Sequence, residues 1–388
     1  MNKLPSGWQI KSLGEVTEII AGQSPPSSTY NEREEGLPFY QGKTDFGEKY
    51  PTARIWCSDP NKIALPNDIL ISVRAPVGPT NICDTEACIG RGLSAIRAGE
   101  STNYKYILYF LRSIEKKLAN QGRGSTFSAI TQTELKEIKV PLPPLPIQKQ
   151  IAEILEKADQ AKQKRKEANR LTEQFLQSAF IEMFGDPVKN TYHYPVLALD
   201  QVCKKLTDGT HNSPKNYEIG KYKYITAKNI KKYGIDLSDI TYVGEEDHKN
   251  IYARCNPEYG DILFIKDGAT TGIAQVNTLK EEFSMLSSLA LFKLNKAMIN
   301  SFYLRDYLNN DFVYKGIRNS MGGAAITRLT IQKLKRIEII VPPISHQEQY
   351  ANLVRKTEAL KEKQKQTEIE LDNLFNSLMQ KAFRGELV

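Results

Sequence analysis

Short apolar runs alternate with turn residues over the first 145 positions of the chain, and the same pattern returns over roughly residues 190–345. Runs such as DILISV (68–73) and DILFI (261–265) are bounded by Gly, Pro, Asn and Asp, which is typical of strands and turns. Between them, residues 103–118 and 300–310 have the spacing of short helices. Both regions are therefore predicted to be mixed α and β domains with a β core.

Two further regions carry a helical pattern of the heptad type. Seam positions, mostly apolar toward both ends and polar in the middle, recur at alternating steps of four and three from residue 147 to 179, and the same register returns when 199 is added. At 1.5 Å per residue a stripe sustained over about 36 residues would be roughly 54 Å long, more than one domain of about 150 residues can bury. We therefore expect the two helices to pair antiparallel; a helix lying on its own domain is the alternative. The residues expected to pair the helices and to dock other subunits are Ile151, Ile154, Ala158, Phe175, Leu353, Leu360, Leu371, Leu374 and Leu378.

The two halves of the chain correspond in sequence. Residues 124–148 align with residues 323–347, and the offset between the copies grows from 186 near their start to 199 at this point. The second copy therefore carries extra residues, which we expect in loops. The pattern predicts an α+β protein with a pseudo-twofold internal repeat. Its parts are a first globular domain (1–146), a first long helix (147–185), a second globular domain (186–345) and a second long helix (346–388).

The composition favours a globular protein with an acidic partner. Lys and Arg number 53 against 45 Asp and Glu, a net charge of +8, and nearly all the excess lies outside the two helical regions. Nucleic acid is one such partner. The chain has no apolar run long enough to span a bilayer and no apolar stretch at its start, so we expect a cytoplasmic protein. Its five cysteines form no C-x-x-C pair, which argues against disulfide frameworks and zinc ribbons.

Motifs for catalysis are incomplete. The stretch from Gly36 to Thr44 has five residues between its glycines where a phosphate-binding loop has four. The tetrapeptide Asn256-Pro257-Glu258-Tyr259 resembles the Asn-Pro-Pro-Tyr motif of amino-methyltransferases, but it has a glutamate at the third position, and we predict a turn. The four histidines show no ligand spacing. We expect no catalytic residue and no metal site.

Basic and aromatic residues punctuate the loops of both globular domains. Arginine and lysine neutralise phosphates, and arginine can grip guanine edges with two hydrogen bonds. An ordinary solvated surface is the alternative for any one of these residues, but as a set they fit a face that binds DNA. The residues predicted to contact DNA, with polar neighbours in the same loops, are Gln23, Tyr40, Lys43, Arg74, Arg91, Arg123, Thr210, His211, Lys228, Asn229, Lys266, Arg318 and Arg328.

Each copy ends in a version of I-T-x-x-x-L-x-x-I-x-x-P-x-P-P-x-x-x-Q followed by a long helix, and in this the chain resembles the specificity (S) subunit of type I restriction-modification systems. In the first copy the pattern runs from Ile130 and Thr131 to Gln148, and in the second from Leu329 and Thr330 to Gln347. The opening LPSGWQIKSLGEV and the tail KAFRGEL also resemble the family. The second copy departs from the first where Gly-Ala-Ala-Ile (323–326) replaces Gly-Ser-Thr-Phe (124–127).

The resemblance implies a non-catalytic subunit that binds double-stranded DNA. Each globular domain would be a target recognition domain reading half of a bipartite site, and the helices would also dock two methyltransferase subunits. It implies no cofactor in this chain, S-adenosylmethionine in the methyltransferase subunits for adenine N6 methylation, and ATP and Mg in two restriction subunits where these are present. A methylation-only system is a near alternative. A coiled-coil scaffold binding protein or carbohydrate, without DNA, is the alternative from another class.

Overall fold

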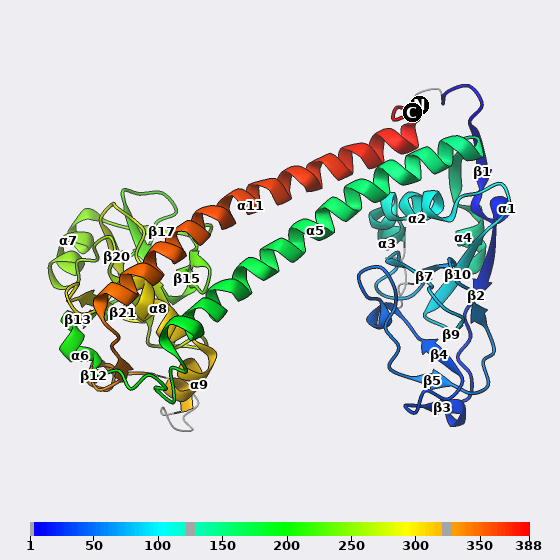
Figure 1. The fold of residues 1–388 in the computed structure, drawn as a ribbon. Helices are drawn as coiled ribbons and strands as arrows, with labels where there is room; N and C mark the ends of the chain where they lie inside the picture. The colour runs from blue at the N-terminus through cyan, green and yellow to red at the C-terminus, as the bar shows by residue number, and fades with distance from the viewer. Residues whose placement is uncertain (1–3, 122–128, 320–327) are drawn as a thin grey trace. The chain divides into compact units, whose positions relative to one another are not determined.

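The computed structural model describes residues 4–121, 129–319 and 328–388. The chain divides into two compact units, which we call unit 1 (Met1–Glu167 and Lys365–Val388) and unit 2 (Ala168–Gln364). The chain has two long helices, α5 (Leu145–Phe184) and α11 (Ile344–Arg384), and each of them has one part in unit 1 and the other part in unit 2 (Figure 1).

Unit 1 is built on two small sheets. The first is antiparallel with the strand order β2-β10-β7-β8, and the second has the order β3-β5-β4-β9-β6, in which β4 and β9 run parallel. Strands β1 and β11 form a separate antiparallel pair. The strands are β1 (Gln9–Ser12), β2 (Thr17–Ala21), β3 (Tyr30–Asn31), β4 (Leu37–Tyr40), β5 (Trp56–Cys57), β6 (Ile63–Ala64), β7 (Ile69–Ser72), β8 (Thr80–Ile82), β9 (Ala87–Ile89), β10 (Leu93–Ala98) and β11 (Lys139–Leu142).

Among the described residues of unit 1, four short helices accompany these strands: α1 (Leu13–Val16), α2 (Tyr104–Ser113), α3 (Glu115–Gln121) and α4 (Gln132–Glu137). The predicted helix at 103–118 is thus two helices, α2 and α3. Helix α2 buries six consecutive residues from Tyr106 to Leu111. They share one hydrophobic core with Ile151 and Leu155 of α5 and with Phe375 and Met379 of α11. This core fixes the ends of both long helices that belong to unit 1.

Unit 2 repeats this plan with additions. An antiparallel sheet has the order β13-β21-β18-β19, a second sheet has the order β17-β14-β20 with β14 and β20 parallel, and β12 pairs with β22. The strands are β12 (Val196–Ala198), β13 (Cys203–Asp208), β14 (Tyr222–Ile225), β15 (Ile230–Lys231), β16 (Gly234–Ile235), β17 (Thr241–Val243), β18 (Ile262–Ile265), β19 (Ala274–Val276), β20 (Phe283–Met285), β21 (Leu289–Leu294) and β22 (Glu338–Ile340). The helices are α6 (Leu199–Val202), α7 (Glu245–Arg254), α8 (Ser301–Asn309), α9 (Asp311–Asn319) and α10 (Ile331–Lys335).

The expected strands at DILISV and DILFI are β7 and β18, and both are fully buried central strands. The predicted extra residues of the second copy coincide in part with α7, which follows β17; the described part of unit 1 has no helix between β5 and β7.

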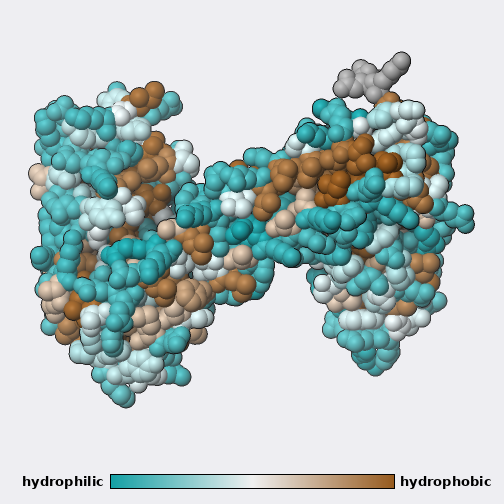
Figure 2. All heavy atoms as spheres, turned by 45° about the horizontal axis from the view of Figure 1, so that its top comes forward, coloured by the Kyte–Doolittle hydropathy of each residue, from teal (hydrophilic) through white to brown (hydrophobic). Residues whose placement is uncertain are grey.

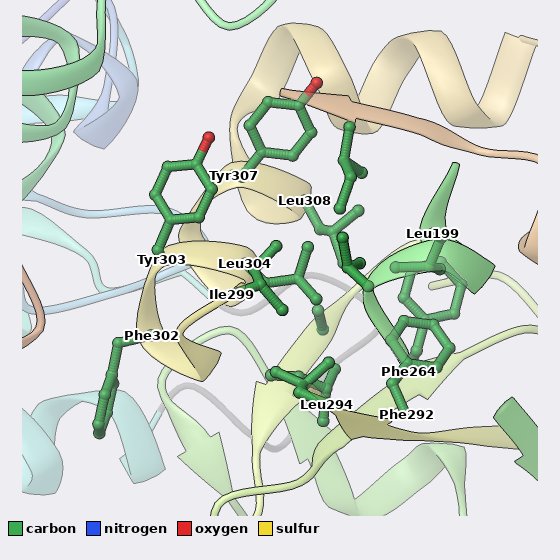
Figure 3. Packing of buried hydrophobic residues seen from close by; sticks show 14 of the residues in the cluster. Leu199, Phe264, Phe292, Leu294, Ile299, Phe302, Tyr303, Leu304, Tyr307 and Leu308 are labelled. Atoms are coloured by element: carbon green, nitrogen blue, oxygen red, sulfur yellow. The ribbon is translucent and has the colours of Figure 1, made fainter. Parts of the chain in front are cut away.

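Helix α8 closes the core of unit 2. Leu304 and Leu308 of α8 lie toward Phe264 and Phe292 of the sheet, and the ring of Tyr303 points away from these two rings within the same cluster (Figure 3). Phe180 and Phe184 of α5 join this cluster, and the Phe180 ring stacks on Tyr303 at a centroid distance of 5.6 Å. At about 25 cal/mol per Å² of apolar surface removed from water, such aromatic side chains contribute a large share of the stabilisation.

The two long helices contact one another within each unit. In unit 1, Lys162 of α5 forms an ion pair of 2.8 Å with Asp372 of α11. In unit 2, the amide of Gln364 in α11 donates a 3.0 Å hydrogen bond to the hydroxyl of Thr172 in α5. In unit 1 the first half of α5 therefore meets the second half of α11, and in unit 2 the second half of α5 meets the first half of α11. This is the order expected of antiparallel helices.

The burial along the helices corrects part of the expected seam. Ile151 is buried, but Phe175, Leu360 and Leu374 are 50%, 49% and 50% exposed. Ile154, Ala158, Leu353, Leu371 and Leu378 are partly buried. A heptad pattern anticipates only a second helix, whereas α5 and α11 also pack against α2 in unit 1 and α8 in unit 2. The buried stripe therefore shifts to neighbours such as Phe375 and Val354.

Candidate nucleic-acid interface

Four loops of unit 1 meet at one end of its sheets. Backbone hydrogen bonds join them: the amide of Gln23 donates to the Ile89 carbonyl (2.9 Å), and that of Val73 donates to the Gly92 carbonyl (3.0 Å). The amide of Gly90 donates to the Tyr40 carbonyl (2.8 Å). We call residues 22–24, 41–46, 73–76 and 90–92 loop cluster 1. It exposes the side chains of Gln23, Lys43, Arg74 and Arg91.

Two glycines allow the loops of cluster 1 to approach so closely. A β-carbon at Gly92 would lie 2.2 Å from the carbonyl oxygen of Gln41, and one at Gly22 would lie 2.3 Å from that of Gly90. Any other residue would force these backbones apart. The loops that present the polar side chains are therefore held together by the main chain itself.

Asp45 fixes the loop that carries Lys43. Its buried carboxylate accepts hydrogen bonds from the amides of Gln41 (2.7 Å) and Gly42 (3.2 Å), and it pairs with Arg54 at 2.5 Å. Tyr40, which we expected to contact DNA, is only 2% exposed, and burial raises its pKa to about 12. It is a core residue behind the loops because β4 turns its side chain inward.

Unit 2 forms a corresponding group, loop cluster 2, from residues 209–211, 226–229, 266–271 and 286–288. The amide of Thr210 donates to the Met285 carbonyl (2.9 Å), and the amide of Lys266 donates to the Ser288 carbonyl (2.9 Å). His211 and Lys228 are exposed here, and Thr210 is partly exposed. Arg328 is also exposed, and its Nε lies 3.3 Å from Oδ1 of Asp267.

A buried carboxylate organises three basic side chains in cluster 2. Asp208 is 4% exposed and lies 2.5 Å from Nη2 of Arg254, 3.2 Å from Nε2 of His211 and 3.5 Å from Nζ of Lys266. Arg254, at the end of α7, is half exposed and was missed by the sequence analysis because its partner is 46 residues away. Its pairing holds a guanidinium and an imidazole side by side at the surface.

Lys266 and Asn229 do not fit the expected contact with DNA. Lys266 is 1% exposed and is held by Asp267 at 2.9 Å, and Asn229 is 2% exposed. The side chain of Asn229 accepts a hydrogen bond from the Thr226 amide (3.0 Å) and donates to the Asp236 carbonyl (3.1 Å). Both side chains are occupied inside the protein because they brace the loops from behind.

The remaining predicted residues have different surroundings. Arg318 of α9 is partly buried, and its Nη1 donates to the Ala269 carbonyl at 2.7 Å, so it supports the loop at 266–271. Arg123 lies outside the described residues. Residues 37–40 of the stretch that resembled a phosphate-binding loop form strand β4.

The described residues hold no group of three or more His, Cys, Asp or Glu side chains that could bind a metal ion. His248 is buried, with Nδ1 3.0 Å from the Ser284 hydroxyl and its ring stacked on Tyr222 at 3.8 Å. In the described part of the chain, no helix is long and apolar enough to cross a membrane.

The long helices expose apolar side chains. Within unit 2 these are Leu171, Phe175 and Ile181 of α5 and Leu360 of α11, and within unit 1 they are Ile369 and Leu374 of α11. Each is between 43% and 51% exposed. Figure 2 shows hydrophobic side chains gathered along part of these helices. Exposed apolar patches of this kind are typical of protein–protein contact sites.

The paired sheets, the polar loop clusters and the long helices define a two-domain protein of the type I restriction-modification specificity class. The family model for the type I restriction modification DNA specificity domain matches residues 5–173 and 194–371, and the chain belongs to this family.

Individual relatives agree. The chain is 26% identical to the type I restriction enzyme MjaIX specificity subunit of Methanocaldococcus jannaschii over 416 residues, which covers 100% of this chain and 95% of that protein. It is 44% identical to the putative MjaX specificity subunit of the same organism over 173 residues, 43% of this chain and 41% of that protein. The crystal structure of a type I S subunit from M. genitalium matches with a TM-score of 0.63 at 17% identity, covering 99% and 97% of the two chains, which shows a shared fold.

Proposed function

We propose that this chain is the specificity subunit of a type I restriction-modification complex and reads a bipartite site in double-stranded DNA. Two target recognition domains, residues 1–146 and 186–345, would each read one half-site. The long helices, residues 147–185 and 346–388, would join them as a coiled coil with pseudo-twofold symmetry. The chain itself would carry no catalytic group, and it would work in the cytoplasm, where the DNA is.

One observation carries this proposal: both units hold the same framework, yet each presents a different set of polar side chains from it. Cluster 1 exposes Gln23, Lys43, Arg74 and Arg91, whereas cluster 2 exposes His211, Lys228, Arg254 and Arg328. Lysine and arginine neutralise phosphates, while arginine also recognises base edges. Different side chains on one framework would read different half-sites.

The exposed apolar residues of α5 and α11 support docking of methyltransferase subunits on the helices. A contact site for a permanent partner needs a buried apolar centre, and side chains such as Phe175, Leu360 and Leu374 would provide it. We expect two methyltransferase subunits, which bring S-adenosylmethionine for adenine N6 methylation. Restriction subunits would add ATP and Mg and their chemistry.

The test is to co-express the chain with a type I methyltransferase subunit and to map modified adenines by long-read sequencing. The expected result is methylation on both strands of one split, asymmetric motif, present only with this chain. A stable complex that leaves the genome unmodified would contradict the proposal. Binding to duplex DNA that falls steeply with salt would further separate it from a scaffold that binds protein or carbohydrate, since only a DNA-binding protein releases condensed counterions.

A further inference from the structure

A short hairpin follows the loop of Lys43 in unit 1, and its counterpart follows Lys228 in unit 2. In unit 1 the hairpin closes at the bridge between Phe46 and Pro51, and its tip carries Lys49 and Tyr50. In unit 2, β15 and β16 pair with a two-residue turn made by Lys232 and Tyr233. Each tip thus presents a lysine followed by a tyrosine, and we call them tip 1 and tip 2. The pair lies one position later in tip 1, where Glu48 and Lys49 form the turn and the Tyr50 carbonyl accepts a 3.1 Å hydrogen bond from the Gly47 amide.

The two tips are anchored in the same way by a buried amide side chain. In unit 1, Nδ2 of Asn81 donates to the Gly47 carbonyl at 2.8 Å, while its Oδ1 accepts from the Ile82 amide at 2.9 Å. Asn81 is 1% exposed. The main chain of tip 1 is therefore fixed to strand β8.

In unit 2, Nε2 of Gln275 donates to the carbonyls of Lys231 (3.2 Å) and Lys232 (3.4 Å), and its Oε1 accepts from the Val276 amide (2.9 Å). Gln275 is 4% exposed and lies on β19, the counterpart of β8. Strand residues Ile230 and Ile235 pack in the core below it. In both tips the main chain is therefore bonded to a neighbouring strand of the sheet.

The side chains at the tips are free to meet a partner. Tyr233 is 81% exposed and Tyr50 is 42% exposed, and Lys49 and Lys232 are both exposed. Lys232 lies 3.2 Å from Asp311 and 5.4 Å from the ring centre of Tyr314, but exposed ion pairs contribute little and exchange readily. A large aromatic side chain that is exposed beside a lysine adds nothing to the hydrophobic core. Its position is instead typical of a side chain that contacts a partner in the complex.

Tip 2 borders loop cluster 2. Residues 231–233 and Lys228 line one side of a cavity whose other side is the loop from Asp267 to Thr270. The tip therefore faces the same ligand as the loops. The lysines give the cavity a positive rim, and tyrosine hydroxyls and lysine ammonium groups are both common donors to DNA phosphates.

We propose that tip 1 and tip 2 are matched clamps on the DNA backbone, in which Lys49 and Lys232 neutralise a phosphate and Tyr50 and Tyr233 pack on the adjoining sugar and phosphate. This rests on the proposed function. The clamps position each unit on the duplex, while sequence is read by the loop clusters. Each clamp acts on its own half-site.

The test uses the full chain in complex with methyltransferase subunits and a duplex carrying the site mapped by methylation. The variants are Lys49→Ala/Tyr50→Ala and Lys232→Ala/Tyr233→Ala. A matched control, Lys189→Ala/Tyr192→Ala, removes the same charge and a tyrosine that is 52% exposed, but outside the loop clusters. Dissociation constants are measured against salt for the specific duplex and for an unrelated one.

Each tip variant should bind both duplexes several-fold more weakly than the parent, with the slope of log K against log salt reduced by about 1. Hydroxyl-radical protection should fall at one half-site for tip 1 and at the other for tip 2. Binding and slope equal to those of the control would overturn the proposal, and so would a loss confined to one base pair. If the parent complex itself binds duplex DNA without salt dependence, it is the proposed function that fails.

Discussion

The side-chain oxygen of Gln148 accepts a 2.9 Å hydrogen bond from the backbone amide of Asn103, the residue that caps helix α2. The Gln148 amide group donates to the carbonyls of Ser101 (3.1 Å) and Pro143 (2.8 Å), and the residue is 1% exposed. The start of a long helix is thereby joined to the start of a domain helix. The glutamine of the sequence motif therefore has a structural role: its side chain ties the long helix to the domain.

Unit 2 repeats this bond. Gln347 accepts a 2.8 Å hydrogen bond from the Asn300 amide and donates to the carbonyls of Met298 (3.1 Å) and Pro342 (2.7 Å). Replacing Gln148 or Gln347 by alanine leaves one buried amide and two carbonyls without partners, so each should lower the free energy of unfolding by roughly 1–3 kcal/mol. Urea denaturation measures this, with the exposed Gln177→Ala as control. Equal loss in control and variants would contradict the role given to these bonds.

The cap of helix α4 predicts a dependence on pH. The Glu134 carboxylate accepts hydrogen bonds of 2.7 Å from both the amide and the hydroxyl of Thr131, and these bonds lower its pKa. Since the folded pKa lies below the unfolded value of about 4.3, the stabilisation is present above that pH and is lost as the pH falls through the folded value. Glu134→Gln should therefore be less stable than the parent at pH 6, and the gap should narrow as the pH falls below the unfolded value.

The corresponding cap in unit 2 provides the comparison. Thr330 accepts from the Lys333 amide at 3.3 Å, with lysine where unit 1 has Glu134. Because Glu134 is exposed, we expect a small effect, which chemical denaturation of the two variants Glu134→Gln and Lys333→Gln would compare across the pH range. A gap for Glu134→Gln that stays constant from pH 6 to pH 3 would rule out the carboxylate as its origin.

Cluster 1 predicts two kinds of loss on DNA binding. If Arg74 or Arg91 reads a base edge, its replacement by alanine should cost roughly 1–3 kcal/mol and relax the motif at one position. Loss of a phosphate contact, which we expect for Lys43, should instead weaken binding to all sequences alike. Competition binding on single-base variants of the site separates the two patterns. Parental binding by all three variants would exclude this face.

The long helices predict a change in the gap of the recognition site. Inserting four residues in each helix, next to Arg165 and Gln364, would lengthen the helices by ~6 Å, close to two base pairs. We expect methylation to move to a motif with a longer unread gap and unchanged half-sites. A single insertion, in α5 alone, is the control and should abolish activity by breaking the register. An unchanged gap after both insertions would show that helix length does not set it.

Periodicity and internal comparison were enough to predict much of the fold. The strands DILISV and DILFI and the helices near 103–118 and 300–310 are present, since buried central strands and amphipathic helices leave strong local patterns. Phe175, Leu360 and Leu374 were expected in the seam between the long helices, but about half of each residue's surface is exposed. A heptad pattern records that a helix has apolar neighbours without saying which elements supply them.

The candidate site was predictable only in outline. Loop composition pointed to the exposed Lys43, Arg74 and Arg91, but it also selected Tyr40, Lys266 and Asn229, which are buried. A polar residue in a loop motif can equally face inward as a brace, and sequence does not record the direction. Tip 1 and tip 2 were missed because the two hairpins correspond at an offset of 184 residues and their Lys-Tyr pairs are 183 apart, both outside the 186–199 range of the other correspondences.

The buried amides of Asn81 and Gln275 hold their hairpins through main-chain carbonyls, so the anchor is indifferent to the side chains that the hairpin carries. The loop clusters that read sequence are likewise held through main-chain carbonyls, so their side chains can change without disturbing the framework. Two readers that vary independently multiply their repertoires: ten versions of each would yield a hundred composite sites. Such a chain can recognise a new DNA site when the loops of one domain change, while the apolar faces of its helices, and hence its partners, stay the same.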